Sequence, residues 1–243
     1  MAGHSHWAGI KHKKGRADKE RSKIFSKLSR EITVAAKLGD KDPDMNPRLR
    51  TAIQAAKQSN MPKDNIARAI TKSEMSGDKS YENLRYEGFG TSNVAFIIET
   101  LTDNKNRSAS SIRTVLQKNG GRLGASGSVT HMFSNCGIIQ FDKNIISEEE
   151  AFNIAINAGA KDCVNLRDSF EIITEKGDFY KIKTKLEKKI EAFLYSAIEW
   201  RALNYIGLNK EQSDKILEIL TALEELDDVQ NIFTNANLEK IQI

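Results

Sequence analysis

Apolar residues recur every three or four positions in the first third of the chain, which predicts helices there. One helix is expected over residues 22–37, with a single apolar stripe formed by Ile24, Phe25, Leu28, Ile32 and Ala35. A second helix is predicted to begin at Asn46-Pro47, because a capping residue followed by Pro is a typical helix start. A third is expected over residues 63–72, and the polar segment 73–80 is interpreted as a linker.

After residue 80 the apolar residues occur in short runs, which are typical of buried strands. A strand is expected over 94–101, a helix over 108–119 and another strand over 128–133. The following segments have the order strand, helix, strand, strand, helix, strand, which is the ferredoxin-like βαββαβ arrangement. Their expected ranges are 137–142, 147–158, 163–166, 170–174, 178–190 and 199–204. A helix over 210–226 and a strand over 229–234 come after this unit.

This order predicts an α+β fold, with an N-terminal basic helical domain followed by two ferredoxin-like α/β sandwich domains, one inserted in the other. The helical domain is assigned to residues 1–80. Residues 81–135 and 206–243 each supply part of one sandwich, so together they are expected to form a discontinuous domain. The inserted βαββαβ domain is assigned to residues 136–205.

Charge divides the chain into two electrostatic parts. Residues 1–80 contain 18 Lys and Arg against 9 Asp and Glu, a net charge of +9, whereas the remaining residues contain 19 against 24, a net charge of −5. Such asymmetry favours a partner with negative charge, either nucleic acid or an anionic membrane. We expect nucleic acid rather than a membrane surface, because core-type residues occupy the apolar face of the first helix and no Trp or Phe cluster faces a headgroup layer. No stretch approaches the ~20 apolar residues of a membrane span. The absence of a signal-peptide pattern favours a cytoplasmic location.

The basic residues at the N-terminus are mixed with His and with Trp7, so phosphate attraction and base stacking are available in one segment. If the first helix extends back to residue 16, its cations form a row roughly opposite the apolar stripe. The Gly-rich segment 119–130 has two interpretations: a turn that enters a strand, or a loop whose backbone N–H groups bind a phosphate together with Arg122. The candidate nucleic-acid-binding residues are Trp7, Lys11, His12, Lys13, Lys14, Arg16, Lys19, Arg21, Lys23, Lys27, Arg30 and Arg122.

No pattern of a familiar catalytic or cofactor-binding site is found. The sequence lacks HExxH, GxSxG, a GK[ST] phosphate loop and a dinucleotide fingerprint, so neither an enzyme nor a cofactor or small-molecule substrate is predicted. Cys136 and Cys163 are expected to be small buried hydrophobic residues. The N-terminal His residues have the donor types for Cu²⁺ or Ni²⁺, but flexible His binds such ions readily and we assign no metal site.

Several long segments carry unusual motifs, among them MAGHSHWAGIKHKKGRADKERSKIF at the N-terminus, LTDNKNRSASSIR, NGGRLGASGSV and LDDVQNIFTNA. These segments closely resemble the YebC/PmpR family, which includes the mitochondrial translational activator of cytochrome c oxidase subunit I. The resemblance implies three domains and a cytoplasmic, non-enzymatic protein. It implies a role either in transcription regulation, by DNA binding, or in translation regulation, as a ribosome-associated factor that assists synthesis through proline-rich stretches.

Two classes of function therefore stay open from the sequence. The first is a regulator that binds nucleic acid, DNA or ribosomal RNA, through the basic tail and first helix. Readout of duplex DNA by the second helix is weakly supported, because Arg48 and Arg50 point about 200° apart on it, and structured RNA fits the same residues better. The second is a protein-interaction adaptor that uses the acidic α/β domains, with the basic tail only solubilising the chain.

Overall fold

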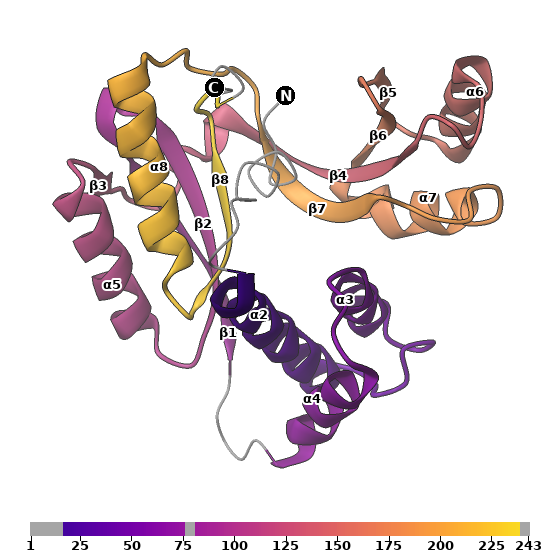
Figure 1. Cartoon of the computed structure of the whole chain (residues 1–243), viewed down its shortest axis with the longest axis horizontal. Coiled ribbons are helices and arrows are strands. Elements are labelled where there is room, and N and C mark those ends of the chain that lie inside the picture. The colour runs from indigo at the N-terminus through magenta and orange to yellow at the C-terminus, as the bar shows by residue number, and fades with distance from the viewer. Residues whose placement is uncertain (1–16, 76–80, 239–243) are drawn as a thin grey trace.

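The computed structural model describes residues 17–75 and 81–238 and arranges them in a helical part and two β-sheets with their own helices (Figure 1). The helical part consists of α2 (Ala17–Leu38), α3 (Pro47–Gln58) and α4 (Lys63–Met75). The side chain of Asn46 accepts a hydrogen bond from the backbone N–H of Leu49, which confirms the predicted start of α3. A small core holds the three helices together, with Ile32, Ala35, Leu49, Ala56 and Ile66 among its buried members.

The first sheet has the strand order β3-β1-β2-β8, and its neighbouring strands are antiparallel. Its strands are β1 (Glu82–Phe89), β2 (Ala95–Thr102), β3 (Arg122–Leu123) and β8 (Val229–Thr234). Helices α5 (Lys105–Lys118) and α8 (Lys210–Glu224) cover one face of this sheet (Figure 1). Buried Phe96, Ile98, Ile112, Ile216 and Leu220 belong to the core between the sheet and these helices.

The second sheet has the strand order β5-β6-β4-β7, again with antiparallel neighbours. Its strands are β4 (Phe133–Asp142), β5 (Asp162–Asn165), β6 (Ser169–Glu175) and β7 (Tyr195–Ala202). Helices α6 (Glu148–Ala158) and α7 (Phe179–Leu186) pack on one face through Phe141, Ala151, Phe170 and Phe179. Ser147 caps α6 and Gly159 ends it in the left-handed conformation, both as predicted.

The α+β class and the helical N-terminal part agree with the prediction, and the elements of the second sheet have the predicted βαββαβ order, whereas those of the first sheet have the order β1-β2-α5-β3-α8-β8 and are not ferredoxin-like. Two strands, β1 and the two-residue β3, were missed, and one predicted strand was wrong. The strand β1 was missed, because its buried positions include Glu87 and Gly88 rather than a run of apolar residues. The predicted strand over 128–133 is instead a short 3₁₀ turn at Thr130–Met132 that leads into β4, because Val129 and Thr130 donate their N–H groups to the carboxylate of Glu87.

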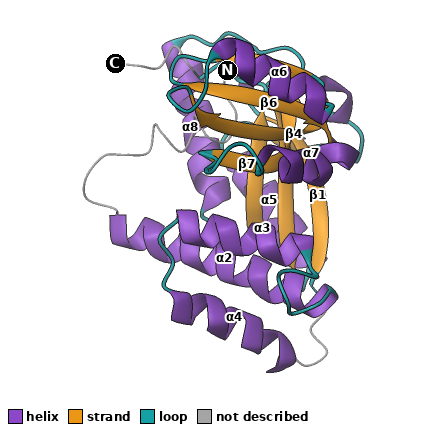
Figure 2. Cartoon of the chain, turned by 90° about the vertical axis from the view of Figure 1, so that its right-hand side faces the viewer, coloured by secondary structure: helices purple, strands orange, loops and turns teal. Residues whose placement is uncertain are grey.

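The three parts contact one another through specific side chains. Trp200 of β7 donates its indole N–H to Glu99 of β2 at 3.0 Å. The side chain of Gln54 in α3 accepts a hydrogen bond from Lys183 of α7 at 2.6 Å. The turned view shows the helical part lying below the second sheet (Figure 2). The helical part therefore contacts both sheet-containing parts, and its surface is divided between these contacts and solvent.

Candidate nucleic-acid interface

The predicted interface begins in residues whose structure is not described. Trp7, Lys11, His12, Lys13, Lys14 and Arg16 lie outside the described residues. Lys19 falls within α2, which begins at Ala17 and so extends back nearly as far as the cation row required. The side chains of four predicted residues on or near α2 can be placed, namely Arg21, Lys23, Lys27 and Arg30.

The cation row of α2 does not face open solvent along its whole length, which the sequence did not predict. Arg21 is exposed, but Lys23 forms an ion pair with Glu225 at 3.3 Å and Lys27 is half-buried. Arg30 Nη1 donates to the carboxylate of Asp228 at 3.1 Å and to the carbonyl of Asp227 at 2.7 Å. The reason is that α2 packs on α3 and α4 along one side and touches the turn between α8 and β8 along another. A single-helix projection of the sequence cannot reveal this second contact.

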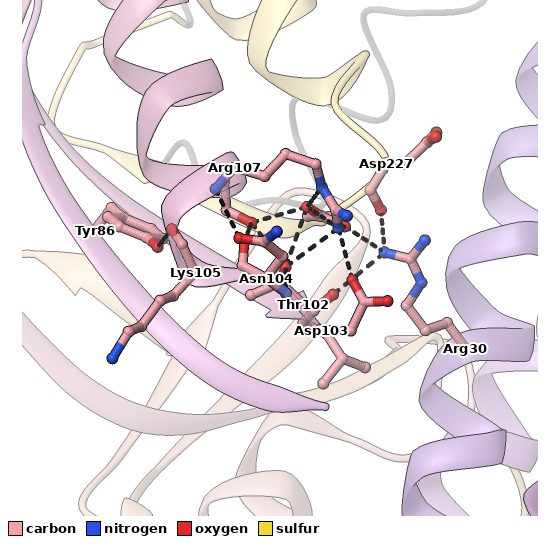
Figure 3. Close-up of polar contacts among 11 residues, drawn as sticks. Arg30, Tyr86, Thr102, Asp103, Asn104, Lys105, Arg107 and Asp227 are labelled. Carbon is pink, nitrogen blue, oxygen red and sulfur yellow. Dashed lines mark hydrogen bonds and ion pairs between the residues drawn. The ribbon is translucent and has the colours of Figure 1, made fainter. Parts of the chain in front are cut away.

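Asp228 is the centre of a polar cluster that joins α2 to the first sheet (Figure 3). We call it the Asp228 cluster, and its members are Arg30, Thr102, Asp103, Arg107, Ser108 and Asp228. Arg107 Nη2 lies 2.9 Å from one carboxylate oxygen of Asp228 and 3.1 Å from the other. Ser108 Oγ donates to the same carboxylate at 2.8 Å. The motifs LTDNKNRSASSIR and LDDVQNIFTNA therefore meet at this cluster.

The charges of the Asp228 cluster are balanced within the chain. Burial would raise the pKa of the Asp228 carboxyl, but hydrogen bonds from Arg107, Ser108 and Thr102 outweigh it and the pKa is lowered. Hydrogen bonds from Arg107 to Asp228 and Asp103 raise the pKa of the Arg107 guanidinium. Arg30 and Arg107 thus stabilise an ionised carboxylate at neutral pH, and the cluster connects α2 to the first sheet.

The Gly-rich segment 119–130 directs its backbone donors inward. Glu87, only 2% exposed, accepts hydrogen bonds from the N–H groups of Gly127, Val129 and Thr130 at 2.9, 2.7 and 3.1 Å. These three donors are not available for a phosphate, which supports the interpretation of this segment as a turn. The guanidinium of Arg122 is exposed and lies 4.6 Å from the ring centroid of Phe89. Arg122 is therefore accessible, although its loop is not a phosphate cradle.

A polar cleft between α2 and α4 was not foreseen from the sequence. It has a volume of about 350 Å³ and is lined by Ser26, Ser29, Arg30, Thr33, Asn65, Arg68, Ala69, Lys72 and Tyr81. We call it the α2–α4 cleft. Three of these residues, Asn65, Arg68 and Lys72, are spaced three and four apart on α4 and therefore share one face of that helix. This spacing could have indicated a shared polar face from the sequence, but solvent-exposed helix faces commonly show the same spacing.

Metal binding in the part of the chain that the structure describes would depend on clusters of His, Cys, Asp and Glu side chains and on the exposure of the two cysteines. No group of three or more His, Cys, Asp and Glu residues there is placed to hold a metal ion. Cys136 and Cys163 are buried, as expected, and burial raises the pKa of each thiol to about 11. No helix in the same residues is long and apolar enough to cross a membrane.

Comparison with known proteins gives matches along nearly the whole chain. The family model "TACO1/YebC protein N-terminal domain" matches residues 5–76, and the model "TACO1/YebC second and third domain" matches residues 81–236. A protein of Pelagibacter ubique named as a probable transcriptional regulatory protein is 54% identical over 239 residues, covering 98% of this chain and 99% of that protein. A protein of Zymomonas mobilis with the same description is 46% identical, covering 98% and 96%. The crystal structure of a conserved hypothetical protein from Aquifex aeolicus is similar with a TM-score of 0.81 and 42% identity, covering 98% of this chain and all of that chain.

Proposed function

Because this chain belongs to the TACO1/YebC family, we propose that it is a non-enzymatic regulator of gene expression that acts by binding nucleic acid through its basic helical part. The relatives named as probable transcriptional regulatory proteins support the regulatory role. The proposed partner is DNA or RNA, the ribosome included, and the proposed location is the cytoplasm. Neither a membrane nor a small-molecule substrate is part of the proposal.

The observation that carries the proposal is the separation of charge between parts of the molecule. Residues 1–80 have a net charge of +9, and the residues that build the two sheets have a net charge of −5. A surplus of this size on one part attracts phosphates, whose condensed counterions are released on binding. The proposed contacts are made by Trp7, Lys11, Lys13, Lys14, Arg16 and Arg21, with His12, Lys19, Lys27 and Arg122 as further candidates.

Lys23 and Arg30 have a different place in this proposal. Both bind acidic groups of the turn between α8 and β8, so in this conformation their charge is partly neutralised by the chain itself. Their proposed contribution is to hold α2 at a fixed angle to the first sheet, while the cations nearer the N-terminus bind phosphate. Arg30 also lines the α2–α4 cleft, where its guanidinium lies 5.9 Å from the ring centroid of Tyr81.

We also propose the domain division that the sequence suggested. The helical domain comprises residues 1–80, residues 81–135 and 206–243 form a discontinuous α/β domain, and residues 136–205 form a ferredoxin-like βαββαβ domain inserted in it. The match of the N-terminal family model to residues 5–76 supports the first boundary. The pairing of β8 with β2, across the four strands of the second sheet in the sequence, supports the insertion.

RNA is favoured over sequence-specific DNA. The guanidinium of Arg48 is bound to Glu31 at 2.7 Å and that of Arg50 to the carbonyls of Pro43 and Asp44, both at 3.0 Å. The two arginines of α3 are therefore engaged within the helical part, and α3 does not present them for reading base edges. Binding through phosphates and stacking is the mode that suits single-stranded or structured RNA. By resemblance to its family, assistance to the ribosome at proline-rich stretches is one role that such binding would serve.

The test compares two variants that remove the same charge from different places. In the first, Lys11, Lys13, Lys14 and Arg16 are each replaced by Gln. In the control, Lys176, Lys181, Lys188 and Lys189 are replaced by Gln, because these lysines are exposed on and around α7 of the acidic part. Affinity for labelled duplex DNA, single-stranded RNA and ribosomal RNA is measured at matched salt.

The proposal predicts that the first variant loses at least about tenfold in affinity, since four phosphate contacts are removed, and that the control changes little. Equal losses in the two variants would mean that only net charge matters, and the proposed site would be wrong. Unchanged regulation in cells by the first variant would favour the second class of function, a protein-interaction adaptor that uses the acidic sheet-containing parts.

A further inference from the structure

We propose that the α2–α4 cleft binds one nucleotide of a single-stranded nucleic acid, with its phosphate on Arg68 and Lys72 and its base against Tyr81. This inference rests on the proposed nucleic-acid binding and assigns it a second site, apart from the basic tail. The lining of the cleft, the fixed position of Arg30 and the size of the cleft each support it.

The lining has the chemistry of an anion site. Among the nine lining residues, all of which belong to the described part of the chain, three are cations and none is Asp or Glu. Ser26, Ser29 and Asn65 add neutral hydrogen-bond donors. The side chains of Ser26, Asn65 and Arg68 make no hydrogen bond or ion pair with any other described residue, so they are available to a ligand. Cations with neutral donors and no carboxylate favour a phosphate.

The neighbouring cleft is a contrast within the same molecule. It has a volume of about 490 Å³, shares Arg30 and Tyr81 with the α2–α4 cleft, and contains Asp103, Asp227 and Asp228 in its lining. There the cations are already bound by carboxylates, as in the ion pair of Arg107 with Asp228 at 2.9 Å. A phosphate entering that cleft would meet three acidic residues, so of the two clefts only the α2–α4 cleft suits an anion.

Arg30 separates the two clefts and is held in place before any ligand arrives. Its Nη1 donates to Leu101 O, Asp227 O and Asp228 Oδ1 at 3.2, 2.7 and 3.1 Å. Its guanidinium lies 5.9 Å from the ring centroid of Tyr81, within the range of a cation–π contact. Because Asp228 offsets much of the charge of Arg30, the exposed guanidinium of Arg68 supplies most of the attraction for a phosphate, and Lys72 lies four residues further along the same face of α4. Arg30 instead fixes the polar wall beside the ring of Tyr81.

The floor and the size of the cleft limit what can enter. The buried hydroxyl of Thr33 lies at the floor of the cleft, 2.8 Å from both Ser29 O and Ala69 O, so its hydrogen-bonding capacity is already used within the protein. A volume of about 350 Å³ is at the small end of the range for small-molecule sites, about 300–1,000 Å³. The cleft therefore suits a single nucleotide rather than a long ligand. A base has to be unpaired to stack on a side chain, which favours a single strand over a duplex.

The experiment uses the full chain and a short labelled single-stranded RNA, with a duplex of equal length as a second probe. The cleft variant is Arg68→Gln with Lys72→Gln. The matched control is Lys57→Gln with Lys63→Gln, because these two lysines are exposed on α3 and α4 and do not line the cleft. Tyr81→Leu removes the ring and Tyr81→Phe keeps it. A thermal melt of each variant checks that it is folded.

We expect the cleft variant to bind the single strand about fivefold or more weakly and with a salt slope about 1 unit shallower. We expect Tyr81→Leu to lose about fivefold, Tyr81→Phe to lose little, and the control to match the unmodified protein. A single strand carrying 5-iodouridine is expected to crosslink to the peptide that contains Tyr81.

Three outcomes would overturn the inference. If the cleft variants bind RNA as the unmodified protein does, while neutralising the tail abolishes binding, the cleft is not a site and the proposed function stands. If the unmodified protein binds none of the probes, the proposed function and the cleft fail together. If poly-glutamate competes with the strand at the cleft and Tyr81→Leu has no effect, the cleft binds acidic protein segments and not a nucleotide.

Discussion

Replacing Asp228 is expected to loosen the attachment of α2 to the first sheet. The side chain of Asp228 is 12% exposed, and its carboxylate accepts hydrogen bonds from Arg30, Arg107, Ser108 and Thr102. The substitution Asp228→Asn keeps the shape but removes the charge and turns one acceptor into a donor that faces Arg107. It therefore tests the electrostatic part of the Asp228 cluster with little change in packing.

The expected loss of stability depends on which hydrogen bonds Arg30 and Arg107 keep when the charge of Asp228 is removed. Breaking a buried ion pair costs about 3–5 kcal/mol, which is an upper bound here. The side chain of Arg107 is 51% exposed and keeps Asp103 at 2.8 Å, so its share is largely screened by water. Arg30 is 22% exposed and keeps the carbonyls of Leu101 and Asp227. We therefore expect Asp228→Asn to lower the free energy of unfolding by about 1–2 kcal/mol, and Asp228→Ala by about 2–3 kcal/mol.

Two assays check this prediction. Urea unfolding of Asp228→Asn, Arg30→Met and the double variant gives a coupling energy, expected to be about 1 kcal/mol for two residues in direct contact. Amide hydrogen exchange should be faster in the peptide that covers the second half of α2.

The pKa of Asp228 is lowered, so its stabilisation is present above the unfolded pKa of about 3.9 and is lost as the pH falls through the folded value. The difference between variant and unmodified protein should therefore shrink in acid.

Strictly additive effects of Asp228→Asn and Arg30→Met, with unchanged exchange in α2, would refute this reasoning. Such a result would mean that the helical part is held in place by other contacts, such as those of α3 with α7, and that the Asp228 cluster is a surface feature.

Three further predictions follow from buried polar groups and one close approach. Burial raises the pKa of Glu199 to about 7 although Tyr195 donates a hydrogen bond to its carboxylate, so the protein loses stability as the pH rises from the pKa of the unfolded chain through 7. Glu199→Gln should therefore be about 1–3 kcal/mol more stable than the unmodified protein at pH ~8. Urea unfolding should show that this difference in stability shrinks towards pH ~5. Glu87→Gln places an amide against the N–H groups of the segment 127–130 and should lower stability by about 2–3 kcal/mol; an unchanged melting temperature would contradict the role of that carboxylate. At Gly137 an added Cβ would meet Thr174 and the ring of Phe179 at distances that real Cβ atoms essentially never show, so Gly137→Ala should destabilise the protein by about 1–3 kcal/mol in a thermal melt, whereas Gly177→Ala, where nothing lies within 4 Å, should be nearly neutral.

Local signals in the sequence were sufficient for most elements. Asn46 and Ser147 were recognised as helix caps, and both side chains accept the expected backbone hydrogen bonds. The helix predicted over 178–190 ends at Leu186, four residues early. The strand β1 was missed because one of its buried positions is a carboxylate whose partners lie about 40 residues further along the chain. The residue pattern within β1 gives no sign of such a distant partner, so a Glu in the sequence is interpreted as solvent-exposed even where it is buried.

The candidate site was predictable in its charge but not in its contacts. The spacing of cations on α2 was read correctly, whereas the pairing of Lys23 with Glu225 and of Arg30 with Asp228 joins residues about 200 positions apart. Only the packed structure brings them together. The same holds for the α2–α4 cleft, since Arg68 and Tyr81 come from α4 and from the residue just before β1. The roles of Trp7 and of the basic residues up to Arg16 stay predictions.

The salt dependence of nucleic-acid binding is the most direct test of the central claim, that the basic N-terminal part binds a polyanion by displacing its counterions. If about six to eight phosphates are neutralised, a plot of log K against log salt for the full chain should have a slope of about −5 to −7 on duplex DNA and a shallower slope on single strands. A slope near zero on every DNA and RNA tested would contradict the account.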